Sequence, residues 1–243
     1  MVTALAEGLC YNTRRMKFAE DIRGVLRIGL ASARANLVPM IVLWMMAVGL
    51  VLGYCLVSEV RGWLGVLEEW QERLGWSAAF VSQALFCGFL PGVFQIAMKR
   101  IRPRRIVLTI LAQLLWCGFS GVIVNIFFRM LGCLVGADAS LPTLVVKTVI
   151  DQFVWTVFIV APANTVFFFW VGRDFSFARA KAEWPRDFIA KVYLPNLISN
   201  WCVWIPTIFL VFAFPVALQV HLCGIACSFW ILMCVQLGRL SGR

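Results

Sequence analysis

Residues 106–128 read IVLTILAQLLWCGFSGVIVNIFF, a run of 23 positions without an acidic or basic side chain. A helix needs about 20 apolar residues to cross the hydrocarbon core of a bilayer. Directly before this run, residues 99–105 read KRIRPRR, the densest group of positive charge in the chain. Together the two stretches predict a membrane-spanning helix that begins beside a basic loop.

The composition of the whole chain agrees with that prediction. Of the 243 residues, 62% are apolar and 14% are charged, whereas soluble domains have roughly 45–50% and about 25%. Further charge-free stretches cover residues 35–58, 74–98, 152–172 and 192–238, and the last is long enough for two helices. We therefore predict an all-α integral membrane protein, a six-helix transmembrane bundle with amphipathic interfacial helices. A soluble enzyme, a secreted disulfide scaffold and a DNA-binding domain are excluded.

The positive charges alternate along the chain. Of the 22 Lys and Arg residues, 18 lie in every second segment between the predicted spans. Such loops face the cytosol or the matrix, so both termini are predicted on that side. The alternation also favours dividing residues 192–238 into two helices, because a single span there would separate the two ends. The predicted break lies near Phe214 and Pro215, with Pro195 and Pro206 as competing break points. The net charge of +10 is therefore attributed to topology, and no nucleic-acid partner is predicted.

Amphipathic segments flank the first predicted span. Residues 1–34 combine basic side chains with apolar residues at helical spacing, which is typical of a helix on a membrane surface; residues 35–243 form the predicted six-span domain. In the first outer loop, Trp63, Leu67, Trp70 and Leu74 follow helical spacing and predict a second interfacial helix. The basic residues of the loop at 99–105 are Lys99, Arg100, Arg102, Arg104 and Arg105. Anionic lipid headgroups are the predicted partner of this loop, and a soluble anion at a pore mouth is the alternative.

Polar side chains inside the apolar stretches are the candidates for function, because each needs a partner or water. A charge-poor lumen lined by amides would pass small polar solutes without strong ion selectivity. The structural alternative is hydrogen bonding between helices for the amides, and an ion pair between Asp151 and Lys147, one helical turn apart. The pore-lining or polar-core candidates are Asn125, Asp151, Gln152, Asn164, Asn196, Asn200 and Gln219.

Catalytic motifs are not found in the sequence. The chain has one histidine and lacks HExxH, GxSxG and a nucleotide-binding glycine loop. His221, Cys223 and Cys227 lie within about one helical turn of each other, but a zinc site needs a fourth ligand, so packing is the favoured interpretation. We predict no enzyme activity, no metal and no cofactor. The glycine pairs Gly49/Gly53 and Gly118/Gly121 predict close helix approach.

Several ordered motifs between residues 74 and 240 resemble those of one membrane-protein family. Residues 118–131 follow a G..GP..H.WY..L pattern in part, and Lys147-Thr-Val-Ile-Asp151-Gln152 follows a K...DQ pattern. Residues 200–206 match an NW..W.P signature. These patterns are similar to those of the Mpv-seventeen/PMP-twenty-two family of peroxisomal and mitochondrial inner-membrane proteins. The family-motif positions are Lys147, Trp184, Trp201, Trp204, Pro206, Pro215 and Trp230.

The resemblance implies a pore-like protein permeable to metabolites. For a eukaryotic chain, the resemblance implies a location in the mitochondrial inner membrane or the peroxisomal membrane. For a bacterial chain, we expect a location in the cytoplasmic membrane. The chain departs from the family at Asn125, Phe127 and Phe128, where the family has His-x-Trp-Tyr. We predict a channel for small solutes, with the lipid bilayer, anionic headgroups and small molecules as partners; a homo-oligomer is compatible with the sequence. The alternative is a non-conducting scaffold or lipid-organising protein.

Overall fold

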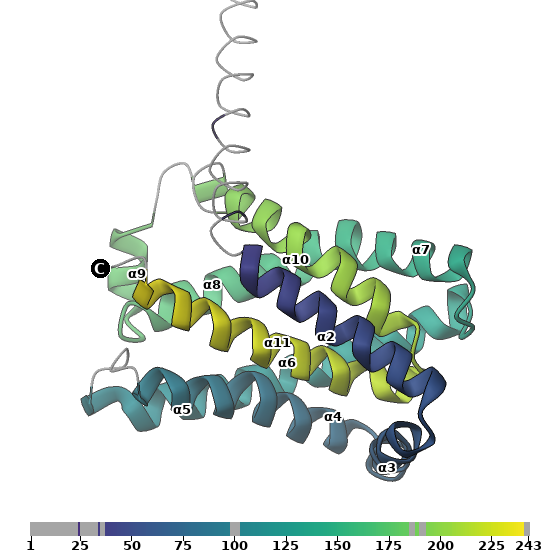
Figure 1. Cartoon of the computed structure of the whole chain (residues 1–243). Coiled ribbons are helices and arrows are strands. Elements are labelled where there is room, and N and C mark those ends of the chain that lie inside the picture. The colour runs from purple at the N-terminus through teal and green to yellow at the C-terminus, as the bar shows by residue number, and fades with distance from the viewer. Residues whose placement is uncertain are drawn as a thin grey trace, which may run out of the picture. The chain divides into compact units, whose positions relative to one another are not determined.

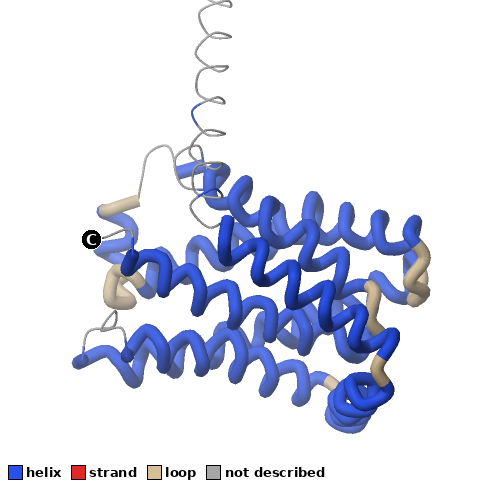
Figure 2. The backbone as a smooth tube through the Cα atoms, viewed as in Figure 1, coloured by secondary structure: helices blue, strands red, loops and turns tan. Residues whose placement is uncertain are grey.

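The computed structural model describes Gly24, Arg34 and residues 37–97, 103–184, 188–189 and 193–240. In this part of the chain every regular element is a helix, as predicted (Figure 2). η1 and η3 are π-helical and η2 is a 3₁₀ turn. The elements (Figure 1) are α2 (Leu37–Leu56), α3 (Ser58–Leu74), α4 (Trp76–Gln83), η1 (Ala84–Phe89), α5 (Leu90–Ala97), η2 (Pro103–Arg105), α6 (Ile106–Val135), α7 (Leu141–Val149), η3 (Ile150–Val160), α8 (Ala161–Val171), α9 (Phe177–Ala182), α10 (Leu194–Phe212) and α11 (Val216–Leu240).

The chain separates into two compact units, each described by itself. Unit 1 comprises Met1–Ala35 and Val157–Val203, and unit 2 comprises Asn36–Thr156 and Trp204–Arg243. In unit 2, α11 packs against α2, α3, α6 and the helix formed by α4, η1 and α5. The hydrophobic core of this unit consists of Leu64, Phe127, Phe128, Leu131, Leu144, Ile208, Val211, Phe212, Phe214, Leu218 and Leu222.

Fewer helices are able to span a membrane than the six predicted. Among the described residues, three continuous helices are long and apolar enough: Trp76–Ala97, Ile106–Val135 and Leu141–Val171. A fourth results if the bent pair Met40–Leu56 and Ser58–Leu74 counts as one span. The prediction of six was wrong because charge-free sequence does not show where a helix ends. The last two predicted spans are the shorter apolar helices Asn196–Phe212 and Val216–Phe229.

The division between those last two helices lies where it was predicted. α10 ends at Phe212 and α11 begins at Val216, so Pro215 lies in the break. Pro206, in contrast, lies inside α10 and does not end it. Gln219 stabilises the turn, because its Nε2 donates to the carbonyl of Phe214 at 2.8 Å.

α2 and α3 meet at a bend of 101° near Val57. Arg61 in α3 donates hydrogen bonds to the carbonyls of Tyr54 and Cys55 at 3.2 and 2.9 Å, and so satisfies the C-terminal end of α2. A separate interfacial helix was predicted here, and α3 is a separate helix, whereas its place at a membrane interface stays a prediction. Leu64 and Gln71 are buried, whereas Trp63 is 75% exposed.

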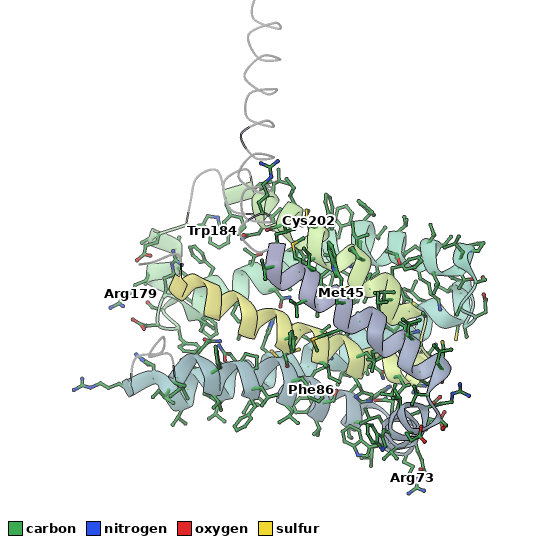
Figure 3. The ribbon with its side chains drawn as sticks, in the orientation of Figure 1. Met45, Arg73, Phe86, Arg179, Trp184 and Cys202 are labelled. Carbon is green, nitrogen blue, oxygen red and sulfur yellow. The ribbon has the colours of Figure 1, made fainter. Side chains whose placement is uncertain are left out.

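Large apolar side chains cover the outside of the long helices. On α2, Met45 is 67% exposed (Figure 3). On α6, an exposed stripe recurs at intervals of three or four residues from Val107 to Leu134. A continuous exposed apolar stripe requires an apolar environment. Together with the helix lengths, these surfaces are compatible with a membrane protein.

Small residues allow α4 and α6 to approach closely, as predicted for one of the two glycine pairs. A Cβ atom at Gly118 would lie 2.6 Å from the Phe80 ring, and one at Gly121 would overlap the side chain of Gln83. Close approach needs glycine at both positions. At Gly49 of the other pair, no atom outside the surrounding helical backbone lies within 4 Å of a Cβ position among the described residues, so the close approach predicted there is not seen within this part of the chain.

Candidate functional site

The polar interior of unit 2 begins with Asn125 on α6. Asn125 is fully buried, and neither atom of its amide group has a hydrogen-bond partner within the described part of the chain. It lies one turn after Gly121 and three residues before Phe128, all on the buried face of the helix. An amide in this position can bind water or a small polar molecule, because buried polar groups are rarely left unsatisfied.

Lys147 is the second buried polar group, and it lies deeper than predicted. The helix containing it begins at Leu141, so Lys147 lies within a continuous span and not before one. Its side chain is 1% exposed, and Nζ has no hydrogen-bond partner among the described residues. Nζ lies 5.8 Å from the centre of the Phe212 ring. This distance is within the range of a cation–π contact, which attracts the charge but leaves the N–H donors without an acceptor.

Asp151 and Lys147 do not form the ion pair that their spacing favours, since Lys147 Nζ has no partner among the described residues. Asp151 is buried, and its Oδ2 accepts a hydrogen bond from Gln152 Nε2 at 2.5 Å. The helix changes from α to π geometry at Ile150, between the two charged residues. Both side chains are nevertheless buried, with 1% of Lys147 and 5% of Asp151 exposed. Asp151 instead has Cys223 of α11 as an electrostatic neighbour.

The turn before Lys147 contains a second acid. Asp138 accepts hydrogen bonds from the Ser140 backbone N–H at 2.9 Å and from Thr143 Oγ1 at 3.2 Å. These bonds, led by the Ser140 interactions, lower the pKa of the Asp138 carboxyl below its ordinary value. The charge of Asp138 also acts on Lys147. Asp138 is thus an acid whose charge acts on Lys147, although its two oxygens already accept hydrogen bonds from Ser140 and Thr143.

α11 adds buried polar groups that the sequence did not identify as a site. His221 is fully buried, its ring centre lies 5.6 Å from that of Trp70, and both ring nitrogens lack partners in the described structure. Gln71 on α3 is also fully buried. Gln71 follows Leu64 by seven residues, or two helical turns, so the sequence spacing could have predicted that both side chains are on the buried face of the helix. The described residues contain no group of three or more His, Cys, Asp or Glu side chains able to hold a metal ion.

The remaining amide candidates divide between the two units. Gln219 belongs to unit 2 and closes the turn at Pro215. Asn164, Asn196 and Asn200 belong to unit 1, where Asn196 is exposed and the other two are half-buried. The structure therefore brings Asn125, Asp151, Gln152 and Gln219 into one compact unit and does not add the unit 1 amides to it.

The tryptophans of the family motifs differ in how deeply they are buried. Trp201 and Trp204 are half-buried on α10. Trp184 is exposed on unit 1 and stacks on Phe188 with ring centres 4.2 Å apart. The side chain of Trp230 lies outside the described residues.

The basic surface predicted to contact anions is described only in part. Arg104 and Arg105 are exposed at the start of α6. Lys99, Arg100 and Arg102 lie outside the described residues, as does nearly all of the predicted interfacial segment 1–34. The predicted lipid contact of this surface stays a prediction.

Comparisons with known protein families, with curated proteins and with solved structures find no match to this chain. The resemblance to the Mpv-seventeen/PMP-twenty-two family stays a prediction.

Proposed function

We propose that this protein is an integral membrane protein that passes small polar solutes through the interior of unit 2. The observation that carries the proposal is a set of buried polar side chains without protein partners: Asn125 on α6, Lys147 on α7 and His221 on α11. Each such group costs about 1–3 kcal/mol when nothing satisfies it. Polar groups at membrane depth are kept where they meet water or solute.

A second candidate function is a non-conducting membrane scaffold. It is favoured by side chains that bond directly to backbone carbonyls of other helices. Gln83 Nε2 donates to the carbonyl of Val220 at 2.5 Å, and Ser228 Oγ donates to the carbonyl of Phe86. These bonds join the α4–η1 helix to α11 without water, as a structural role requires.

The two candidates are distinguished by osmotic swelling of proteoliposomes in a small uncharged solute such as urea. We expect faster swelling than in protein-free liposomes, and a return to the protein-free rate with Asn125→Leu. Leucine has the branching and heavy-atom count of asparagine but a larger volume, so removal of the unsatisfied amide should offset an overpacking cost of about 1–3 kcal/mol and leave the variant folded.

Gln83→Leu is the matched control, because Gln83 is a buried amide whose hydrogen bonds are made within the protein. This variant should lower stability and leave swelling per folded molecule unchanged. Swelling equal to that of protein-free liposomes for the native, correctly folded chain would refute the channel and favour the scaffold.

A further inference from the structure

Lys147 has donor capacity that the protein does not use. An ammonium group carries three N–H donors, yet Nζ of Lys147 has no hydrogen-bond partner among the described residues while its side chain is 1% exposed. The ring face of Phe212, 5.8 Å from Nζ, is an apolar wall and not an acceptor of comparable strength. A buried ammonium group without a hydrogen-bond acceptor or a negative charge beside it is energetically unfavourable.

The nearby acids do not supply that pairing. Asp151 accepts from Gln152 and lies near Cys223. Asp138 acts on Lys147, but its oxygens already accept from Ser140 and Thr143. The described ion pairs do not include Lys147. The described residues therefore leave the N–H donors of the ammonium available to a ligand.

We propose that Lys147 binds the solute that crosses unit 2, and that this solute is a small monovalent anion. The inference rests on the proposed channel and specifies its substrate class. Pores selective for anions use Lys or Arg side chains, and one buried cation matches one negative charge. A lumen lined by amides alone was expected to show no strong ion selectivity. With Lys147 in the lumen, we expect the channel to prefer anions over cations.

The test is the reversal potential of the purified full-length protein in a planar bilayer under a potassium chloride gradient. We expect the native chain to show a chloride-over-potassium permeability ratio well above unity. Lys147→Met should bring this ratio to unity, whereas Lys147→Arg should keep it above unity. Met is close to Lys in length and removes an unpaired buried charge, so this variant should fold.

Lys181→Met is the matched control, because Lys181 is exposed on α9 of unit 1. This variant should leave the ratio unchanged. A second measurement does not depend on conductance: formate should raise the thermal midpoint of the native protein in detergent and leave that of Lys147→Met unchanged, since a ligand stabilises the state that it binds.

The outcomes separate the two proposals. A native chain that conducts without anion preference, or a Lys147→Met variant that keeps the preference, overturns the anion site and leaves the channel standing. A folded native chain that neither conducts nor gains stability from formate refutes both. Stabilisation by formate that requires Lys147, without conductance, refutes the channel and supports an anion-binding site in a scaffold.

Discussion

Replacing Gly121 with alanine should push α4 and α6 apart. A Cβ atom at this position would overlap Cβ and Cγ of Gln83 and would lie 2.9 Å from the backbone carbonyl oxygen of Ala79. The side chain of Gln83 has little room to move, because its Nε2 also lies 2.8 Å from the Cβ position of Gly224 on α11. The carbonyl of Ala79 moves only if α4 moves with it.

The expected cost follows from three contributions. Overpacking costs about 1–3 kcal/mol, and loss of the Gln83 hydrogen bond to Val220 adds about 0.6 kcal/mol. Alanine returns about 1 kcal/mol through its higher helix propensity. The net loss in the free energy of unfolding is therefore about 0.5–2.5 kcal/mol.

Gly49→Ala is the matched control, because Gly49 lies inside α2 and has no atom within 4 Å of its Cβ position. This variant should gain about 1 kcal/mol. Both variants are measured by reversible unfolding in mixed detergent micelles, followed by far-ultraviolet circular dichroism. Equal stabilities would refute the close approach of α4 and α6. Adding Gln83→Ala to Gly121→Ala should recover the part of the penalty due to the Gln83 side chain and leave the part due to the Ala79 carbonyl.

Two further predictions concern α3 and the turn before α7. Leu64→Ala should lower the free energy of unfolding by about 2–5 kcal/mol because Leu64 lies in the core. Trp63→Ala should change it by less than about 0.5 kcal/mol because Trp63 is exposed. A larger loss for Trp63→Ala than for Leu64→Ala in the micelle assay would contradict the burial of Leu64. The lowered pKa of Asp138 means that its stabilising effect is present above its ordinary value of 3.8 and is lost as the pH falls through the lower folded value. Asp138→Asn should therefore weaken the loss of stability in acid, and an unchanged acid titration would count against the bonds from Ser140 and Thr143.

Features determined by local chemistry could be predicted from the sequence. The break at Pro215 follows from a residue that cannot donate a backbone hydrogen bond, and the close approach at Gly118 and Gly121 follows from the absence of side chains. The number of spans could not be predicted in the same way. The bend near Val57 depends on Arg61 reaching back to the carbonyls that end α2, and hydropathy contains no information about that contact.

The spacing of Lys147 and Asp151 favoured an ion pair that the described structure does not contain. Spacing of four residues brings two side chains together only if the helix between them is α-helical. Ile150 keeps α-helical dihedrals, with φ −62° and ψ −45°, so that condition holds up to the residue before Asp151. The acid and the base are nevertheless buried without an ion pair between them in the described structure, because helical spacing does not fix the rotamers of two side chains. π-Helical turns are frequent at functional sites, and here one begins three residues after an ammonium group that has no acceptor among the described residues.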